Sequence, residues 1–326
     1  MTTLIDKFGR EIRYLRISVT DRCDLRCVYC MSEKMTFLPK ADLLTLEELA
    51  KITHRFIDFG VEKIRISGGE PLVRKDVMAL FADISPRLGR GLSELTLTTN
   101  GTQLDKYADQ LAALGVKRIN VSLDSLRAET FAALARRNVL PQVLRGIEAA
   151  KEAGLQIKLN TVLLAENLNE ITDMVRWAHG QGFDMSLIEI MPMGETDAQR
   201  RTQFVPMTRA KDVLQEQFTL SPLVTSTRLS GPARYSYIPE TQGKLGFISP
   251  LTNNFCAGCN RVRLTCTGRI YMCLGQEDHI DLRRTLRGGG DIDAQIARAI
   301  NLKPEAHDFT IADKPSLARH MSVTGG

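Results

Sequence analysis

"IRYLRISVTDRCDLRCVYC", residues 12–30, joins a strand-like run directly to three cysteines. Cys23, Cys27 and Cys30 are separated by three and two intervening residues. Soft thiolates in a short loop suit iron–sulfur chemistry, and three ligands leave one iron of a four-iron cluster open to an exogenous molecule. The residues alone leave two alternatives, a zinc site completed elsewhere in the chain and a set of reactive thiols.

The run at 12–20 is the first of six strand-like runs, each followed by a helical pattern. The other five cover residues 61–68, 92–99, 116–124, 155–163 and 183–191. Helical patterns at 45–60 and 143–154 end at glycines, and the first begins at a threonine cap. This alternation predicts an α/β fold with a parallel sheet, in the form of an incomplete TIM-like barrel of six β/α units. Because barrel active sites lie at the carboxyl ends of the strands, the cysteine loop is expected in the active site.

The rhythm changes after Pro206. Helices are expected near 208–218 and 292–302, with three short β-rich pieces between them, "PLVTSTRL" (222–229), "ARYSYIP" (233–239) and "KLGFIS" (244–249). We therefore predict two domains, a barrel over residues 1–205 and a β-rich C-terminal domain over 206–326 that carries a second cysteine group and binds substrate.

Composition limits the class of protein. A net charge of +5 over 326 residues is too mild to indicate nucleic-acid binding. The longest apolar runs are only strand-length, which predicts no membrane span, and the N-terminus lacks the apolar core of a secretory signal, so a cytoplasmic protein is expected. The seven cysteines fall into two groups more than two hundred residues apart. In a cytosolic protein such clusters indicate metal ligands in preference to disulfides.

The second cysteine group, "CAGCNRVRLTCTGRIYMC", spans residues 256–273. Its spacing alone leaves structural zinc and an iron–sulfur cluster equally open. Arg261 and Arg263 lie between the cysteines, and arginine suits bidentate recognition of phosphates and base edges. These two side chains are expected on one face of a strand, with Val262 on the other.

The first cysteine motif resembles that of the radical S-adenosylmethionine enzymes. "SGGEP" (67–71) resembles the superfamily motif that contacts the methionyl amino group. The resemblance implies that the first three cysteines hold a 4Fe–4S cluster whose open iron chelates S-adenosyl-L-methionine. Reductive cleavage of that cofactor gives a 5′-deoxyadenosyl radical, which abstracts a hydrogen atom from the substrate.

Within this superfamily, the chain resembles the family that cyclises GTP in molybdenum cofactor biosynthesis. The likeness runs nearly end to end and includes "LTTNG" (97–101), "NVSLDS" (120–125), "EIMPMG" (189–194) and the terminal Gly-Gly. It implies a second 4Fe–4S cluster whose open iron binds guanine, with Cys266 as a non-ligand. The implied ligands of this cluster are Cys256, Cys259 and Cys273.

The resemblance also assigns roles to individual positions. Substrate contacts are implied for Arg16, Arg65, Thr98, Lys158, Arg261, Val262 and Arg263. Cofactor contacts are implied for Tyr29, Gly69, Ser122 and Met191. Catalytic roles are implied for Cys23, Cys27, Cys30, Arg261, Arg263, Gly325 and Gly326. Cations on the strands would suit a triphosphate, although each could instead form a salt bridge at the barrel rim.

The implied reaction removes the 3′ hydrogen of GTP and joins C3′ to C8 of guanine, on the way to molybdopterin. The implied partners are a reductant such as flavodoxin or ferredoxin and the downstream enzyme cyclic pyranopterin monophosphate synthase. The chain could also form a homodimer, and no binding to nucleic acid or to a membrane is expected. The alternatives are another radical S-adenosylmethionine enzyme with an auxiliary cluster and a non-catalytic zinc-binding interaction protein.

Overall fold

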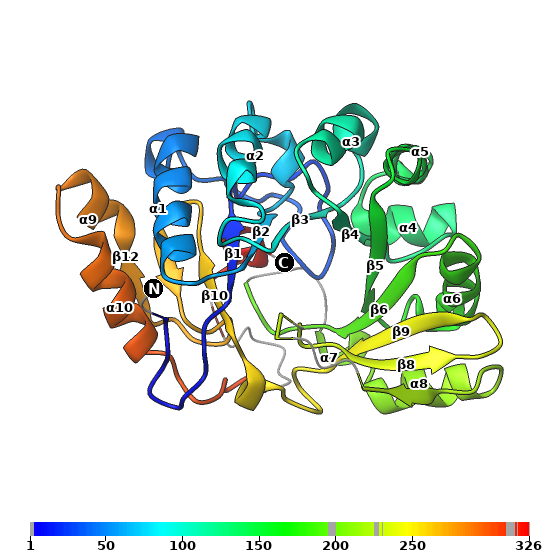
Figure 1. Ribbon diagram of the computed structural model, residues 1–326. Helices are drawn as coiled ribbons and strands as arrows, with labels where there is room; N and C mark the ends of the chain where they lie inside the picture. The colour runs from blue at the N-terminus through cyan, green and yellow to red at the C-terminus, as the bar shows by residue number, and fades with distance from the viewer. Residues whose placement is uncertain are drawn as a thin grey trace.

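A computed structural model of the chain describes residues 3–194, 200–224, 228–229, 231–310, 317 and 319–325. Its strands form one sheet in the order β12-β11-β10-β1-β2-β3-β4-β5-β6-β9-β8-β7. The sheet is curved, with α1, α2, α3 and α5 on its outer side and the C-terminal end of the chain inside the curve (Figure 1). The strands are β1 (Tyr14–Ser18), β2 (Lys63–Ser67), β3 (Glu94–Thr99), β4 (Arg118–Ser122), β5 (Gln156–Leu163), β6 (Asp184–Glu189), β7 (Ser221–Leu223), β8 (Arg234–Ile238), β9 (Gly243–Ile248), β10 (Arg261–Leu264), β11 (Arg269–Tyr271) and β12 (His279–Asp281).

The predicted β/α alternation is confirmed. Each of the six expected runs contains one of the strands β1–β6, and neighbours in this series pair in parallel. Every residue of β1 and β2 is buried, because one face meets the helices and the other faces the interior of the curve. This arrangement sets the carboxyl ends of the strands, and the loops after them, at one edge of the sheet.

Two helices, α1 and α5, end just before the glycines that the sequence predicted as their ends. The helices of the described residues are α1 (Leu46–Asp58), α2 (Met78–Ile84), α3 (Leu104–Ala113), α4 (Ala128–Ala135), α5 (Leu140–Glu152), α6 (Ile171–Gly180), α7 (Arg200–Gln203), α8 (Met207–Gln215), α9 (Leu282–Arg287), α10 (Ile292–Asn301) and α11 (Met321–Thr324). Thr45 caps α1 in a reciprocal capping box with Glu48. Gly60 and Gly154, just beyond α1 and α5, have φ values of +87° and +77°, a region that favours glycine.

The C-terminal strands extend the barrel sheet at both of its edges. β9 pairs in parallel with β6, and β10 pairs in parallel with β1. The β-rich extension is thus hydrogen-bonded to the first and last strands of the predicted barrel, which leaves neither edge of the six-stranded core unpaired. The division of the chain at residue 205 stays a prediction.

The end of the chain returns to the inside of the curve. Helix α11 packs against β1, and the Ser18 hydroxyl on that strand donates a hydrogen bond to the Ser322 carbonyl. Figure 1 shows the C-terminus beside β1 and β2. Among the helices that the structure describes, none combines the length and apolar character needed to cross a bilayer.

Candidate active site of two adjoining cavities

The first cavity opens at the cysteine loop that follows β1. Its lining includes all three thiols of this loop, at Cys23, Cys27 and Cys30. Cys23 Sγ accepts from the Leu25 amide at 3.4 Å and from Asn100 Nδ2 at 3.7 Å. The "LTTNG" segment, which spans the end of β3 and the turn after it, therefore helps to hold the first cysteine, and the loops at the carboxyl ends of β1 and β3 meet at one edge of the sheet.

Burial governs the chemistry of these three thiols. Burial, together with the negative charge of Asp124, raises the pKa of Cys30 to about 12. The pKa values of Cys23 and Cys27 are also raised, first by burial and then by the neighbouring carboxylates of Glu70 and Asp124 respectively. Thiols held protonated are poor nucleophiles, which argues against the reactive-thiol alternative. A metal cation would supply the charge that such thiolates need.

The "SGGEP" turn brings β2 against the cysteine loop. A Cβ on Gly69 would lie 2.4 Å from the Arg22 carbonyl oxygen, so only glycine permits this approach. Glu70 is fully buried and accepts hydrogen bonds from the Thr99 hydroxyl at 2.8 Å and the Asn100 amide at 2.6 Å. Burial raises the pKa of Glu70 and outweighs the lowering by these hydrogen bonds, which leaves the value at about 8. The turn thus fastens the ends of β1, β2 and β3 together.

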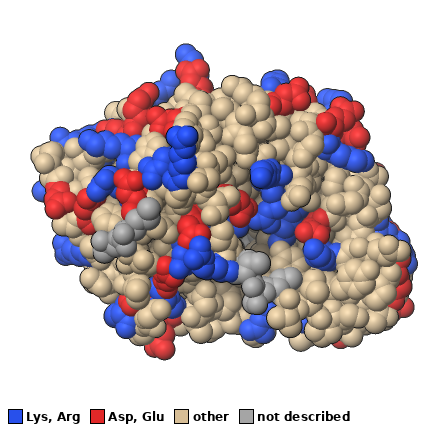
Figure 2. Space-filling view, in the orientation of Figure 1, with Lys and Arg blue, Asp and Glu red and all other residues tan. Residues whose placement is uncertain are grey.

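The second cavity is lined by seven cations, and no Asp or Glu among the described residues lines it. They are Arg16, Lys63, Arg65, Arg118, Lys158, Arg261 and Arg263. Figure 2 shows Lys and Arg side chains gathered at a hollow in the middle of the face shown. A cavity with this charge suits a polyanionic ligand.

Strand register explains how the cations meet. Arg16 on β1 lies opposite Arg263 on β10 and opposite Arg65 on β2, so three guanidinium groups form one row across adjacent strands. Arg261 and Arg263 line the cavity, whereas Val262 is buried in the hydrophobic core, as the alternation of a strand predicts. The Val262 side chain therefore does not reach the cavity, and its position does not support the substrate contact that the resemblance implied.

Most of these cations lack a carboxylate partner. Lys63 and Arg118 share Glu94, at 2.7 Å and 2.6 Å, and so form a salt bridge at the rim. In contrast, Arg16, Arg65, Lys158 and Arg263 are 6–9% exposed and form no ion pair with a described carboxylate. The buried Nε atoms of Arg16 and Arg65 have no hydrogen-bond partner among the residues that the structure describes. Buried cations whose hydrogen-bond donors are unpaired in this way suit the binding of an anionic ligand.

The charges act on one another across this cavity. Burial lowers the pKa of Lys158 to about 7, with the positive charges of Arg65 and Arg118 adding to the effect. Burial raises the pKa of Tyr14, but four cations around its ring, Arg65 foremost, outweigh burial and lower the value to about 6. An anion bound here would relieve this repulsion.

Three of the second-group cysteines, Cys256, Cys259 and Cys273, line the cationic cavity. Burial raises the pKa of Cys259, but the charges of Lys303 and Arg261 outweigh burial and lower it to about 7. Cys266 is fully buried elsewhere, hydrogen-bonded to Ser18 with burial raising its pKa to about 12. Its separation from the other three thiols agrees with the expected non-ligand.

The donor chemistry of both groups fits iron–sulfur clusters, with three soft thiolate ligands on one cavity wall in each case. In the described parts of the chain, no three His, Cys, Asp or Glu side chains are arranged around a single metal ion.

The remaining predicted positions that the structure describes lie on the two cavities or beside them. The first cavity is lined by Tyr29, Gly69, Thr98, Ser122 and Met191. Thr98 pairs in register with Asn120, which lines the second cavity. Met191 lines both cavities, together with Asn160 and Ile188. Gly325 lies against Ser67, and Gly326 falls outside the described residues.

Sequence reasoning missed several residues of these walls, among them Tyr14, Asn120 and Asn160. Each lies two positions from a predicted site residue on the same strand, Arg16, Ser122 and Lys158 in turn. Side chains at i and i+2 share a face of a strand, so the period of two was the signal that could have found them. Lys303 does not line either cavity but lies 3.5 Å from Cys259 Sγ; it gave no such signal, because it lies in an irregular segment 44 residues from that cysteine.

Comparisons with known proteins agree with this geometry. Residues 17–178 match the Radical SAM superfamily, and residues 183–309 match the family described as Molybdenum Cofactor Synthesis C. The GTP 3′,8-cyclase of Mesorhizobium japonicum is 56% identical over 331 residues, covering 99% of both chains. That of Bradyrhizobium diazoefficiens is 57% identical over 334 residues, covering 100% of this chain and 96% of the relative.

Solved structures show a similar fold at low sequence identity. Streptococcus suis SuiB bound to its precursor peptide SuiA has a TM-score of 0.60 at 16% identity, covering 90% of this chain and 65% of SuiB. The same protein bound to S-adenosylmethionine has a TM-score of 0.59 at 17% identity, covering 84% of this chain and 64% of SuiB. These likenesses concern the fold alone. The near full-length identity to the curated relatives goes further, and this chain belongs to the GTP 3′,8-cyclase family of the radical SAM superfamily.

Proposed function

We propose that this chain converts GTP into (8S)-3′,8-cyclo-7,8-dihydroguanosine 5′-triphosphate, the first step of molybdopterin biosynthesis. The observation that carries the proposal is the row of Arg263, Arg16 and Arg65, buried in a cavity that lacks a described carboxylate lining. A triphosphate carries several negative charges, and arginine forks match phosphate oxygens. This cavity adjoins the one that holds the first cysteine loop.

The two cavities divide the work. In the first, Cys23, Cys27 and Cys30 would hold a 4Fe–4S cluster, and Gly69 and Ser122 would contact S-adenosylmethionine. When bound there, the cluster and the cofactor would supply the radical chemistry that removes a hydrogen atom from the substrate. In the second, the remaining cysteine trio would hold another 4Fe–4S cluster beside the guanine base.

The residues of the chain would bind and orient the substrate and shield the reaction from water. Arg16, Arg65 and Arg263 would hold the triphosphate, which fixes the ribose relative to the neighbouring cavity. Asn160 and Met191 line both cavities and so form the boundary across which hydrogen would pass. Met321 of the C-terminal tail lines the first cavity, where it would exclude water from a reactive species.

The wider setting forms part of the same proposal. We infer a cytoplasmic enzyme that takes its electrons from a flavodoxin- or ferredoxin-like reductant. Its product would pass to cyclic pyranopterin monophosphate synthase, and the chain could act as a homodimer. The barrel would comprise residues 1–205 and the auxiliary-cluster region residues 206–326.

Anaerobic incubation with GTP, S-adenosylmethionine and dithionite tests the proposal. The expected products are the cyclised nucleotide and 5′-deoxyadenosine in equal amounts, from a brown protein with about eight irons per chain. A colourless protein that holds zinc would point to the non-catalytic alternative. Consumption of S-adenosylmethionine on a peptide, with GTP untouched, would point to a different radical enzyme.

A further inference from the structure

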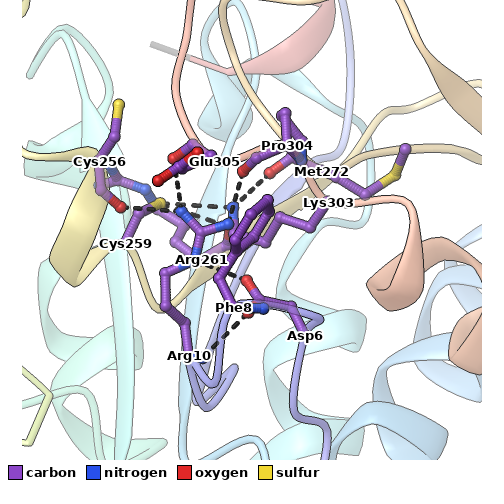
Figure 3. A network of polar contacts seen from close by, with 10 residues as sticks. All are labelled: Asp6, Phe8, Arg10, Cys256, Cys259, Arg261, Met272, Lys303, Pro304 and Glu305. Atoms are coloured by element: carbon purple, nitrogen blue, oxygen red, sulfur yellow. Dashed lines mark hydrogen bonds and ion pairs between the residues drawn. The ribbon is translucent and has the colours of Figure 1, made fainter.

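Lys303 and Arg10 link the segments that carry Cys256, Cys259 and Cys273 to one short segment, residues 303–305. Figure 3 shows Lys303, from the irregular segment after α10, and Arg10, from the N-terminal loop, beside Cys256 and Cys259. The proposed function assigns no task to either residue. The two residues differ in charge balance: Arg10 pairs with a carboxylate, whereas Lys303 has no carboxylate partner among the described residues.

Lys303 bridges the two stretches of chain that carry the ligands. Its Nζ donates to the Met272 carbonyl at 2.6 Å and to the Arg261 carbonyl at 3.0 Å. The same atom lies 3.5 Å from Cys259 Sγ. Met272 directly precedes Cys273, so one ammonium group contacts the Cys259 segment and the Cys273 segment together. An ammonium has three donors, and these three acceptors account for them.

Arg10 fastens the remaining cysteine. Its Nη1 donates to the carbonyls of Cys256 at 2.9 Å and Glu305 at 2.8 Å, and its Nη2 donates to the Pro304 carbonyl at 2.5 Å. Its Nε pairs with Asp6 at 2.6 Å, and the Asp6 carboxylate is fully buried. The charge of Arg10 is therefore neutralised by a carboxylate.

The charge of Lys303 has no such counterpart. The side chain is 1% exposed, and it forms no ion pair with a carboxylate in the described ranges. A buried ammonium is costly unless a negative group lies beside it. The groups beside this one are carbonyl dipoles and the sulfur of a cluster ligand, which places the missing negative charge at the cysteine group.

We propose that Lys303 is a positioning residue for the second cysteine group, and that its positive charge raises the reduction potential of the cluster held there. The inference rests on the proposed function, because it requires a 4Fe–4S cluster at this group. Three thiolates make the cluster environment negative, and reduction adds one more electron. A cation and a hydrogen bond at a ligand sulfur favour the reduced form, especially where burial weakens screening.

The experiment isolates the second cluster in the full-length chain by changing Cys23, Cys27 and Cys30 to Ala. After anaerobic reconstitution, the readouts are iron per chain and a redox titration followed by electron paramagnetic resonance. Lys303→Met should retain about four irons and titrate at a more negative potential than the parent. Lys303→Arg should return the potential towards that of the parent.

Two matched variants separate the charge from its surroundings. Arg10→Met should lower the iron content while the loaded fraction keeps a potential near the parental one, because the charge removed was already neutralised. Lys51→Met removes an exposed lysine of α1 and should change neither readout. A parental potential in fully loaded Lys303→Met would overturn the proposal.

Lys303→Gln covers the case in which Lys303→Met does not hold a cluster, since glutamine keeps a donor without the charge. A loaded Lys303→Gln at the parental potential would overturn the proposal, and a more negative potential would support it. If both neutral variants lose iron while Lys303→Arg retains it, the requirement for a cation at this position is supported. A parent that binds no iron would instead overturn the proposed function, and this inference with it.

Discussion

Arg263 on β10 donates a hydrogen bond from Nη1 to the Gly325 carbonyl oxygen at 2.6 Å, across 62 residues of sequence. Arg16 on β1 reaches the same oxygen at 3.3 Å. One backbone carbonyl of the tail thus lies against two cations of the predicted substrate cavity. The tail joins the site through its main chain, which explains why residues without side chains can matter there.

Arg263→Ala should lower kcat/KM for GTP cyclisation by about thirty- to a thousand-fold. The reason is that a buried charged hydrogen bond to a substrate contributes about 2–4 kcal/mol. Iron content should stay at the wild-type level, because Arg263 is not a ligand. Arg269→Ala, on the exposed side of β11, is the control and should retain wild-type activity. Unchanged kcat/KM in iron-loaded Arg263→Ala would remove this residue from the substrate site.

Gly325→Ala should displace the tail and reduce cyclisation. The residue has a φ of +77°, and an added Cβ would lie 2.8 Å from Ser67 Oγ. Gly289→Ala is a matched control, because its φ is +69° but nothing lies within 4 Å of the added Cβ. Both variants bear the backbone cost of about 1 kcal/mol, and only Gly325→Ala adds the clash. Limited proteolysis of the C-terminus and product formation measure the effect, and equal behaviour of the two variants would contradict it.

Cys273→Ser should lose about half of the iron and abolish GTP cyclisation, whereas slow cleavage of S-adenosylmethionine at the first cluster could persist. Cys266→Ser should keep iron content and turnover near wild type, because its thiol lies apart from the other three and contacts Ser18. Cys27→Ser completes the set and should abolish 5′-deoxyadenosine formation. Loss of half the iron on changing Cys266 would overturn the ligand assignment.

Binding of GTP should take up protons through Lys158 near pH 8. The pKa of this lysine is lowered to about 7 by burial and by the neighbouring arginines, so the amine is mostly neutral at pH 8 in the free protein. A bound triphosphate favours the ammonium form, and affinity should therefore fall as pH rises above about 7. The folding stability of the free protein depends on pH in the opposite direction to GTP affinity. Below pH 7 the depressed pKa of Lys158 destabilises the folded state, and this destabilisation decreases as pH rises towards the ordinary pKa of lysine.

Calorimetry of GTP binding in buffers of different ionisation enthalpy measures this proton uptake. Lys158→Met should remove the Lys158 contribution and leave only the titration of the phosphate groups. Lys211→Met, an exposed residue of α8, serves as the control. Proton uptake that is identical in wild type and Lys158→Met would refute the assignment.

Much of this molecule was determined by local sequence. The six β/α units, the Thr45 cap, the glycines after α1 and α5 and both cysteine motifs follow from short-range patterns, because periodicity and turn chemistry act over a few residues. The opposite orientations of Arg261 and Val262 likewise follow from the period of a single strand.

Only the tertiary structure decided which of these pieces meet. Parallel register between β10 and β1 sets Arg263 beside Arg16, the return of the tail sets Gly325 against both, and the irregular segment after α10 sets Lys303 against Cys259. None of these contacts follows from a local pattern, because each joins segments at least 44 residues apart whose approach depends on how the sheet pairs and closes its core. Local sequence determines which side chains are present and on which face of a strand they lie. Long-range packing determines which residues contact them, and therefore the electrostatic environment of the site.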